Sequence, residues 1–277
     1  MNQPTASLEA RNLVKEFRLR NGLKFSTLQA VKDVSFTLEA GRTIALVGES
    51  GSGKSTIARM IAKLETPTSG DILLDGSPSG TRGRALAAYR GDVQMVFQDP
   101  FASLNPFHSI EHHLERPIRI HHPELSRAEV RDRVLSLLER VRLTPATQFA
   151  ERRPHELSGG QRQRVAIARA LAPGARFIVA DEPVSMLDVS IRLGVLNLLA
   201  ALQREERLGV LYITHDLATA RHFSDEILVM YRGEIVERGP ADAVILDPQH
   251  DYTKRLLEAA ADPERLGALR DEVRSAG

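Results

Sequence analysis

The 277-residue chain contains no cysteine. This absence excludes disulfide bonds, iron–sulfur clusters held by thiolates and zinc sites built on cysteine. It is compatible with the cytosol without establishing that compartment. The chain also has no excess charge of either sign, because 37 lysines and arginines stand against 36 aspartates and glutamates. Overall charge therefore does not point to nucleic acid or to an anionic membrane as a partner.

Two kinds of hydrophobic segment are missing as well. No apolar run approaches the length needed to cross a bilayer, so any membrane span must come from another chain. Residues 1–5 do not form a basic stretch followed by an apolar core, and we expect no signal peptide. The length suits one large α/β domain with additions, or at most two domains, and it is sufficient to bury a substantial core.

The chain is organised around residues 48–56, with the sequence GESGSGKST. An apolar, β-prone run at 43–47 precedes them and a segment of helical composition at 57–62 follows. Between a strand and a helix, GxxxxGK[ST] is typical of a phosphate-binding loop, in which glycines let backbone N–H groups point at phosphate oxygens. We expect Lys54 to reach the β- and γ-phosphates and the Ser55 hydroxyl to bind Mg²⁺. The alternative is an accidental glycine-rich turn. The predicted nucleotide contacts are Gly48, Glu49, Ser50, Gly51, Ser52, Gly53, Lys54, Ser55 and Thr56.

Hydrophobic patterns along the chain predict alternating strands and helices. Half-buried strands are expected at 7–19 and 31–38, and the basic, polar stretch over 18–28 between them is expected to form a hairpin excursion. Capping-box chemistry at Ser126–Glu129 predicts one helix start. Further strands are expected at 71–74, 93–97, 177–180 and 210–213, with a closing hairpin at 227–231 and 234–236. A loop with one short helix is expected at 77–92, and helices at 101–156, from about 161, at 190–206 and from 242 onwards, where the last residues are expected to fray.

Residues 157–161, LSGGQ, come immediately before one of these helices. Serine and two glycines at a helix start leave backbone N–H groups and the positive helix end to face a second phosphate. An ordinary N-cap and turn is the alternative. The residues concerned are Ser158, Gly159, Gly160 and Gln161.

Acidic residues end the strand at 177–180. Asp181 is placed to hold Mg²⁺, and the adjacent Glu182 can accept a proton from an attacking water; a structural acid pair at a turn is the alternative. Gln98 and His215 also follow strands, and we expect Gln98 to contact Mg²⁺ or the water and His215 to bind the γ-phosphate. With Lys54, these strand ends are predicted to converge on one crevice of an open α/β sheet.

These motifs resemble the nucleotide-binding subunit of an ABC transporter over about residues 8–240. Residues 48–56 match its Walker A motif, Gln98 the Q-loop, 157–161 the signature, 177–182 Walker B, 185–188 the D-loop and His215 the switch histidine. The resemblance implies that Asp188 acts at the nucleotide and that Phe17 stacks on adenine, although a core strand aromatic is an equally simple reading of Phe17. Met186 stands where alanine is usual.

A narrower resemblance to dipeptide and oligopeptide importer ATPases rests on the excursion at 18–28, on 97–106 and on 247–253. Asp251 departs from the proline usual in that tail, and the tail cysteines of some relatives are absent. Relatives of this type also import nickel chelates, glutathione or oligosaccharides.

The implied protein has an α/β P-loop core with a small antiparallel β subdomain, a helical subdomain at about 100–157, an ATPase domain at 7–240 and a helical tail at 241–277. Two ATPase subunits, identical or paralogous, would sandwich two ATP molecules with Mg²⁺. They would act on separate membrane permease subunits at the cytoplasmic face of the inner membrane, and indirectly on an extracytoplasmic solute-binding protein. The region after the Q-loop, including Pro106 and Phe107, would receive the membrane subunit.

Three alternatives stay open at this stage. A soluble ABC ATPase acting on nucleic acid or ribosomes is disfavoured by the balanced charge and by the absence of long coiled-coil or zinc insertions. An ATP-gated interaction module is disfavoured by Glu182 and His215. Finally, a histidine-rich stretch is either a metal site or a solvated surface, and no matching set of acids accompanies it; its members are His108, His112, His113, His121 and His122.

Overall fold

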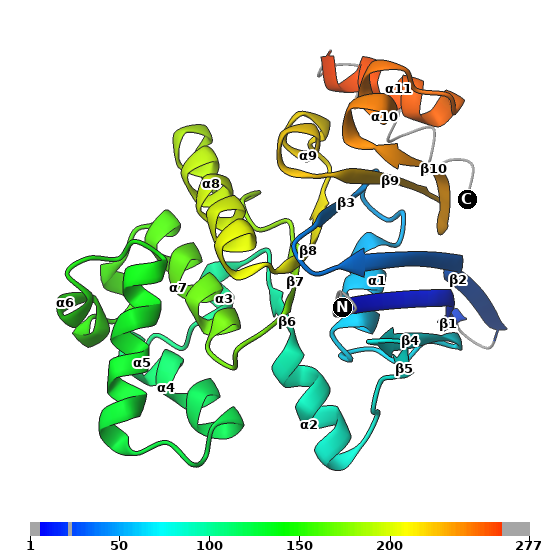
Figure 1. Ribbon diagram of the computed structural model, residues 1–277. Helices are drawn as coiled ribbons and strands as arrows, with labels where there is room; N and C mark the ends of the chain where they lie inside the picture. Colours follow the sequence, from blue (N-terminus) through cyan, green and yellow to red (C-terminus); the bar gives the residue numbers. More distant parts are fainter. Residues whose placement is uncertain (1–5, 22–23, 262–277) are drawn as a thin grey trace, which may run out of the picture. The chain divides into compact units, whose positions relative to one another are not determined.

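The computed structural model describes residues 6–21 and 24–261 (Figure 1). It divides into two compact units. The first unit comprises residues 1–78 and 211–277, and the second comprises residues 79–210.

The first unit contains an antiparallel sheet with the strand order β2-β1-β4-β5. Its core includes Leu8, which pairs with Leu38 on one side and with Leu74 on the other, so apolar residues gather on one face. The strands are β1 (Ser7–Asn21), β2 (Lys24–Glu39), β4 (Ser69–Leu74) and β5 (Ser77–Pro78).

The strand predicted at 31–38 is much longer in the structure, because β2 already begins at Lys24. The two sides of the expected hairpin excursion are paired as antiparallel strands, with Arg18 opposite Thr27 and Leu19 opposite Ser26. Backbone hydrogen bonds of an antiparallel pair do not depend on side-chain polarity, so a polar segment can continue the ladder. Residues 22–23 lie outside the described part of the chain.

A second group of strands in the first unit has the order β10-β9-β3-β8. All residues of β3 (Thr43–Val47) are buried, as the continuous apolar run predicted. β9 (Glu226–Tyr231) runs parallel to β3 and antiparallel to β10 (Glu234–Pro240), which confirms the closing hairpin. The remaining elements are β8 (Gly209–Thr214), α1 (Lys54–Ile61), α9 (Leu217–Phe223), α10 (Ala241–Leu246) and α11 (Asp251–Ala261).

In the second unit, β6 (Val93–Val96) runs parallel to β7 (Phe177–Asp181). The predicted helical region is confirmed, and Ser126 and Glu129 form the expected capping box at the start of α5. The apolar residues Val130, Val134 and Leu137 of that helix are buried. The helices are α2 (Gly83–Asp92), α3 (Pro100–Ser103), α4 (Ile110–His121), α5 (Arg127–Arg140), α6 (Ala146–Glu151), η1 (Pro154–Glu156), α7 (Gly159–Leu171) and α8 (Val189–Glu206).

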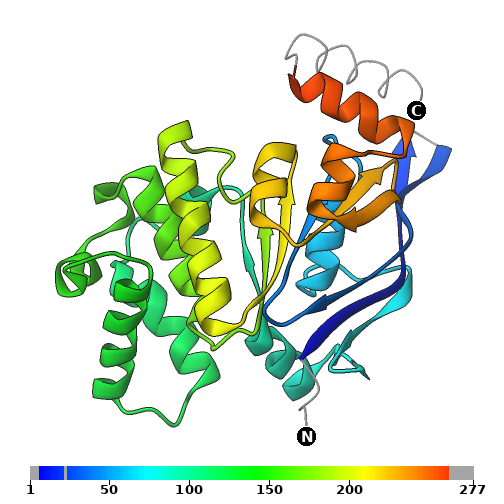
Figure 2. The ribbon, with the colours of Figure 1, turned by 45° about the horizontal axis from the view of Figure 1, so that its top comes forward.

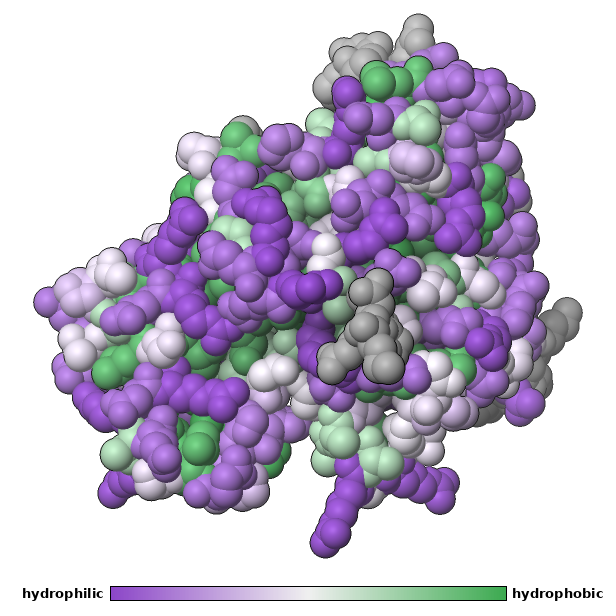
Figure 3. Space-filling model, viewed as in Figure 1, coloured by the Kyte–Doolittle hydropathy of each residue, from purple (hydrophilic) through white to green (hydrophobic). Residues whose placement is uncertain are grey.

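The face drawn in Figure 3 is mostly hydrophilic, with hydrophobic residues distributed in small groups. Within residues 6–21 and 24–261, none of the helices combines the length and the apolar character needed to cross a membrane.

Candidate active site

The glycine-rich loop lies between β3 and α1 in the first unit, as predicted. Gly48 has a φ of 150° and Gly53 a φ of 108°, values that favour glycine. A Cβ atom on Gly48 would lie 2.2 Å from the Met230 backbone oxygen, and one on Gly53 would lie 2.3 Å from the Ala30 backbone oxygen. The loop thus lies against the backbone of β9 and of β2, where only glycine fits.

The side chain of Lys54 folds back onto this loop and binds its backbone. Its Nζ donates hydrogen bonds to the carbonyl oxygens of Gly48 and Glu49, both at 2.7 Å, and only 5% of the residue is exposed. The loop is also tied to its surroundings, because Gly233 N donates to Ser52 O at 3.0 Å. These contacts hold the lysine and the loop backbone in one compact arrangement.

Three further predicted residues belong to the first unit. Ser55, at the start of α1, is exposed, and His215 directly follows β8 and is also exposed. Phe17 lies opposite Leu28 in the β1–β2 pair and is half-buried, with the Lys15 Nζ 5.0 Å from the centre of its ring. Phe17 is thus not part of the fully buried core that contains Leu13. Its role in stacking on adenine stays a prediction.

In the second unit, Asp181 is the last residue of β7 and is 9% exposed. Glu182 follows with a φ of 46°, an uncommon conformation for a residue other than glycine. Gln98 Nε2 donates a hydrogen bond to Glu182 Oε2 at 3.0 Å, so residues 84 positions apart are brought together. The strand expected over 93–97 ends one residue earlier, at Val96, and Gln98 lies in the loop that follows it.

The signature segment has the local geometry of a capped helix. Ser158 is the N-cap of α7, its Oγ accepts from Gln161 N at 3.3 Å, and Gln161 Oε1 accepts from Ser158 N at 3.0 Å. This capping box is compatible with a role at a phosphate, since the 13-residue helix α7 carries the positive end of its dipole there. A Cβ on Gly160 would lie 2.5 Å from Ile191 Cγ2, so glycine permits the contact with α8.

The D-loop region lies between β7 and α8. Asp188 is exposed and is the N-cap of α8, without a side-chain capping hydrogen bond. Ser185 Oγ donates to the carbonyl oxygen of Glu182 at 3.1 Å, which links this turn to the acidic strand end. Met186, where alanine is usual, is 54% exposed, so the larger side chain fits without displacing the core.

The predicted Mg²⁺ ligands Ser55, Gln98 and Asp181 offer hydroxyl, amide and carboxylate oxygens, which suit this ion. Because the amide nitrogen of Gln98 donates to Glu182, its oxygen is the atom that would bind the ion. Within the described part of the chain, histidines, cysteines and acids do not form a group of three or more placed to hold a metal. The histidine-rich segment instead shows the rings of His108 and His112 stacked at 4.1 Å.

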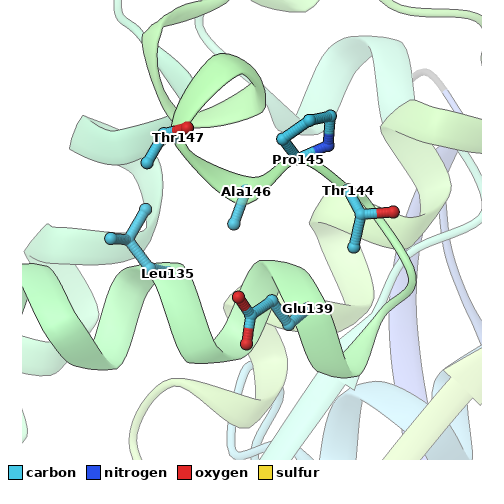
Figure 4. A pocket seen from close by; sticks show the side chains of 6 residues that line it. All are labelled: Leu135, Glu139, Thr144, Pro145, Ala146 and Thr147. Atoms are coloured by element: carbon cyan, nitrogen blue, oxygen red, sulfur yellow. The ribbon is translucent and has the colours of Figure 1, made fainter.

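A surface pocket in the second unit lies away from these motifs in the sequence (Figure 4). It is formed by α5 and the start of α6, and none of the predicted site residues lines it. The lining residues are Leu135, Glu139, Thr144, Pro145, Ala146 and Thr147. The candidate site is therefore identified by its loop and strand-end chemistry, and not by this concavity.

A glycine-rich loop closed by its own lysine, between a buried strand and a helix, defines a P-loop nucleotide-binding protein of the α/β class. The ABC transporter family matches residues 31–185, and the chain belongs to this family. It is an ATP-binding and ATP-hydrolysing subunit, which confirms the fold class and the activity expected from the motifs.

Several characterised relatives cover most of the chain. The oligopeptide transport ATP-binding protein OppF of Haemophilus influenzae is 45% identical over 95% of this chain and 80% of that protein. The glutathione import ATP-binding protein GsiA of Escherichia coli O6:H1 is 48% identical over 93% of this chain and 42% of that protein.

Solved structures share the fold. The dimeric ATP-binding cassette MJ0796, bound to ADP and phosphate, has a TM-score of 0.73 at 32% identity and covers 84% of this chain and 98% of its own. The Clostridium perfringens protein cbiO1, part of an ABC transporter complex, has a TM-score of 0.75 at 26% identity and covers 95% of this chain and 98% of its own.

Proposed function

We propose that this chain hydrolyses ATP to power the uptake of short peptides through separate membrane subunits. One observation carries the proposal: alignment over more than nine tenths of the chain with ATP-binding proteins named for oligopeptide transport and for glutathione import. Oligopeptides and glutathione share amide-linked amino acids, which makes a short peptide the solute class that both relatives support.

In this proposal the first unit binds the triphosphate. Backbone N–H groups of the glycine-rich loop and the Lys54 ammonium contact the phosphates, and Phe17 stacks on adenine. The residues proposed to hold Mg²⁺ are Ser55, Gln98 and Asp181. The bound ion would neutralise part of the charge on the β- and γ-phosphates.

The second unit supplies the acid–base group. Glu182 accepts a proton from the water that attacks the γ-phosphate in line, and the hydrogen bond from Gln98 orients its carboxylate. The same hydrogen bond supports the roles proposed for Gln98 and Glu182 together, because it holds in place the carboxylate that takes the proton. His215 is assigned to the γ-phosphate, which its exposed position after β8 allows.

Two ATPase subunits are proposed to face each other head to tail, with Ser158–Gln161 and Asp188 of one acting on the nucleotide of the other. The exposed positions of Ser158 and Asp188 and the dimeric state of a 32% identical cassette support this arrangement.

The membrane permease subunits are proposed to contact the segment after Gln98, where Phe107 is 80% exposed. The chain would thus lie peripherally on the cytoplasmic face of the inner membrane, and a solute-binding protein would act indirectly.

The test is to purify the chain with the membrane proteins that associate with it and to reconstitute the complex in liposomes. We expect ATP-dependent uptake of a radiolabelled short peptide, delivered by the cognate binding protein, and no uptake by a matched complex carrying Glu182→Gln. Copurification with ribosomes or nucleic acid and no membrane protein would overturn the proposal. A complex that transports an oligosaccharide or a nickel chelate, and no peptide, would overturn the substrate class alone.

A further inference from the structure

One peptide group of the glycine-rich loop is held from two sides in the first unit. The carbonyl oxygen of Gly48 accepts a hydrogen bond from Lys54 Nζ at 2.7 Å. The N–H of Glu49, which belongs to the same peptide plane, donates to the Tyr252 hydroxyl at 3.1 Å. A residue of the C-terminal helix α11 therefore fixes the orientation of the carbonyl that receives the P-loop lysine.

Tyr252 is itself rigidly placed. It is 1% exposed, and its ring lies 4.2 Å from that of Tyr231, the last residue of β9. The backbone N–H of Tyr252 also donates to His250 Nδ1 at 3.1 Å. Burial raises the pKa of the Tyr252 phenol, so the hydroxyl stays neutral. Its oxygen is therefore an uncharged acceptor, and the buried, stacked ring holds it in place.

The segment that carries Tyr252 is anchored on β10. The Glu237 carboxylate accepts from the backbone N–H of Gln249 at 2.7 Å and from that of His250 at 3.1 Å. Figures 1 and 2 both show α10 and α11 beside β9 and β10. A continuous set of contacts thus runs from β10 through the start of α11 to the glycine-rich loop.

We propose that Tyr252 is a positioning residue for ATP binding, which holds the Gly48–Glu49 peptide plane so that Lys54 and the loop are prearranged for phosphate. The inference rests on the proposed role of Lys54 in contacting the triphosphate. Without the tyrosine hydroxyl, the N–H of Glu49, a residue only 6% exposed, loses this acceptor, and the peptide plane is held less firmly. Part of the binding free energy of ATP is then used to order the loop, and the affinity for ATP falls.

The test uses the full chain with Tyr252→Phe, which removes one oxygen and keeps the stacked ring. Tyr212→Phe is the matched control, because Tyr212 is also buried in the first unit and its hydroxyl lies 3.1 Å from Thr219 Oγ1, in a different contact. ATP affinity is measured by calorimetric titration, and the melting temperature without nucleotide is measured for each variant. We expect Tyr252→Phe to weaken ATP binding about three- to tenfold, the range for loss of one net hydrogen bond, and Tyr212→Phe to leave it unchanged.

Lys54→Ala separates this inference from the proposed function. If Lys54→Ala weakens ATP binding and Tyr252→Phe does not, the positioning role is overturned and the P-loop assignment stands. The same holds if both tyrosine variants lose affinity in proportion to their melting temperatures, which would show a general structural effect. If Lys54→Ala binds ATP like the wild type, the phosphate-binding role and the inference that rests on it both fail.

Discussion

Gln98 Nε2 lies 3.0 Å from Glu182 Oε2 and donates a hydrogen bond to it. The two residues follow β6 and β7, which are parallel neighbours in the second unit. One side chain that is assigned to Mg²⁺ thus also orients the carboxylate that is assigned to the attacking water. This coupling makes the acid–base step sensitive to both residues.

Glu182→Gln should reduce ATP turnover by about two to four orders of magnitude while ATP still binds, because the amide keeps the size but cannot accept the proton. The closed dimer should then accumulate with ATP, as an ATP-dependent peak in light scattering. Steady-state phosphate release and nucleotide titration measure the two effects separately. Near-normal hydrolysis would show that another residue carries the base role.

Lys54→Ala should weaken ATP binding by at least about tenfold, since hydrogen bonds to charged groups contribute about 1.5–3 kcal/mol. Lys32→Ala is the matched control, because that lysine forms a surface ion pair with Glu234 at 3.1 Å. Calorimetric titration with ATP gives the comparison. An unchanged affinity for Lys54→Ala would remove the assignment of the loop.

Phe17→Ala should weaken ATP binding by about 1–3 kcal/mol if the ring stacks on adenine, while Phe17→Tyr should largely preserve it. The half-buried state of Phe17 makes a small effect on folding the expected result. Thermal melting without nucleotide provides the second measurement. A large loss of melting temperature for Phe17→Ala would favour a core role instead.

Ser158→Arg and Lys54→Ala should each abolish hydrolysis and should restore part of it when the two variants are mixed, provided the chain self-associates. In the mixed dimer, one site combines an intact Lys54 with the intact Ser158 of the other subunit. Phosphate release from defined mixtures measures the recovery. Heterodimers that form and remain inactive would contradict action across the dimer, or show that both sites must hydrolyse together. If the natural partner is a paralogue, the same variants are divided between the two proteins.

The hydrogen bonds from Gln249 and His250 to the Glu237 carboxylate, which anchor the segment before α11, should weaken in acid. Burial by itself would raise the pKa of Glu237, but the hydrogen bonds from the backbone N–H groups of Gln249 and His250 lower it, and the pKa lies below its ordinary value of 4.5. A lowered folded-state pKa means that the stabilisation is complete above the unfolded value and is lost as the pH falls through the folded value. The melting temperatures of wild type and Glu237→Gln should therefore differ by a constant amount at neutral pH and converge below pH 4.5. A difference that does not change in acid would contradict the ionised anchor.

Local sequence predicted the elements that depend on near neighbours. The strand at 43–47 is confirmed, and the helix expected over 57–62 is present but begins earlier, at Lys54, so that it includes the end of the glycine-rich motif. The capping box of Ser126 and Glu129 is confirmed for the same reason, since its partners are three residues apart. The start of β2 was predicted wrongly, because its ladder depends on pairing with β1 and not on its own alternation. The proposed domain limits at 7–240 and 241–277 stay predictions.

The sequence by itself determined the family and the residues of its motifs, because each motif is a short, contiguous pattern that carries its own chemistry. Tertiary structure decided how those residues are held. Glu49 and Tyr252 are 203 positions apart, and no periodicity or spacing indicated that the tail reaches the loop. Likewise, Gly48 is required by the backbone of Met230 in a distant strand. Such contacts are made by backbone groups and single atoms that leave no trace in local composition, so only the folded chain brings them together.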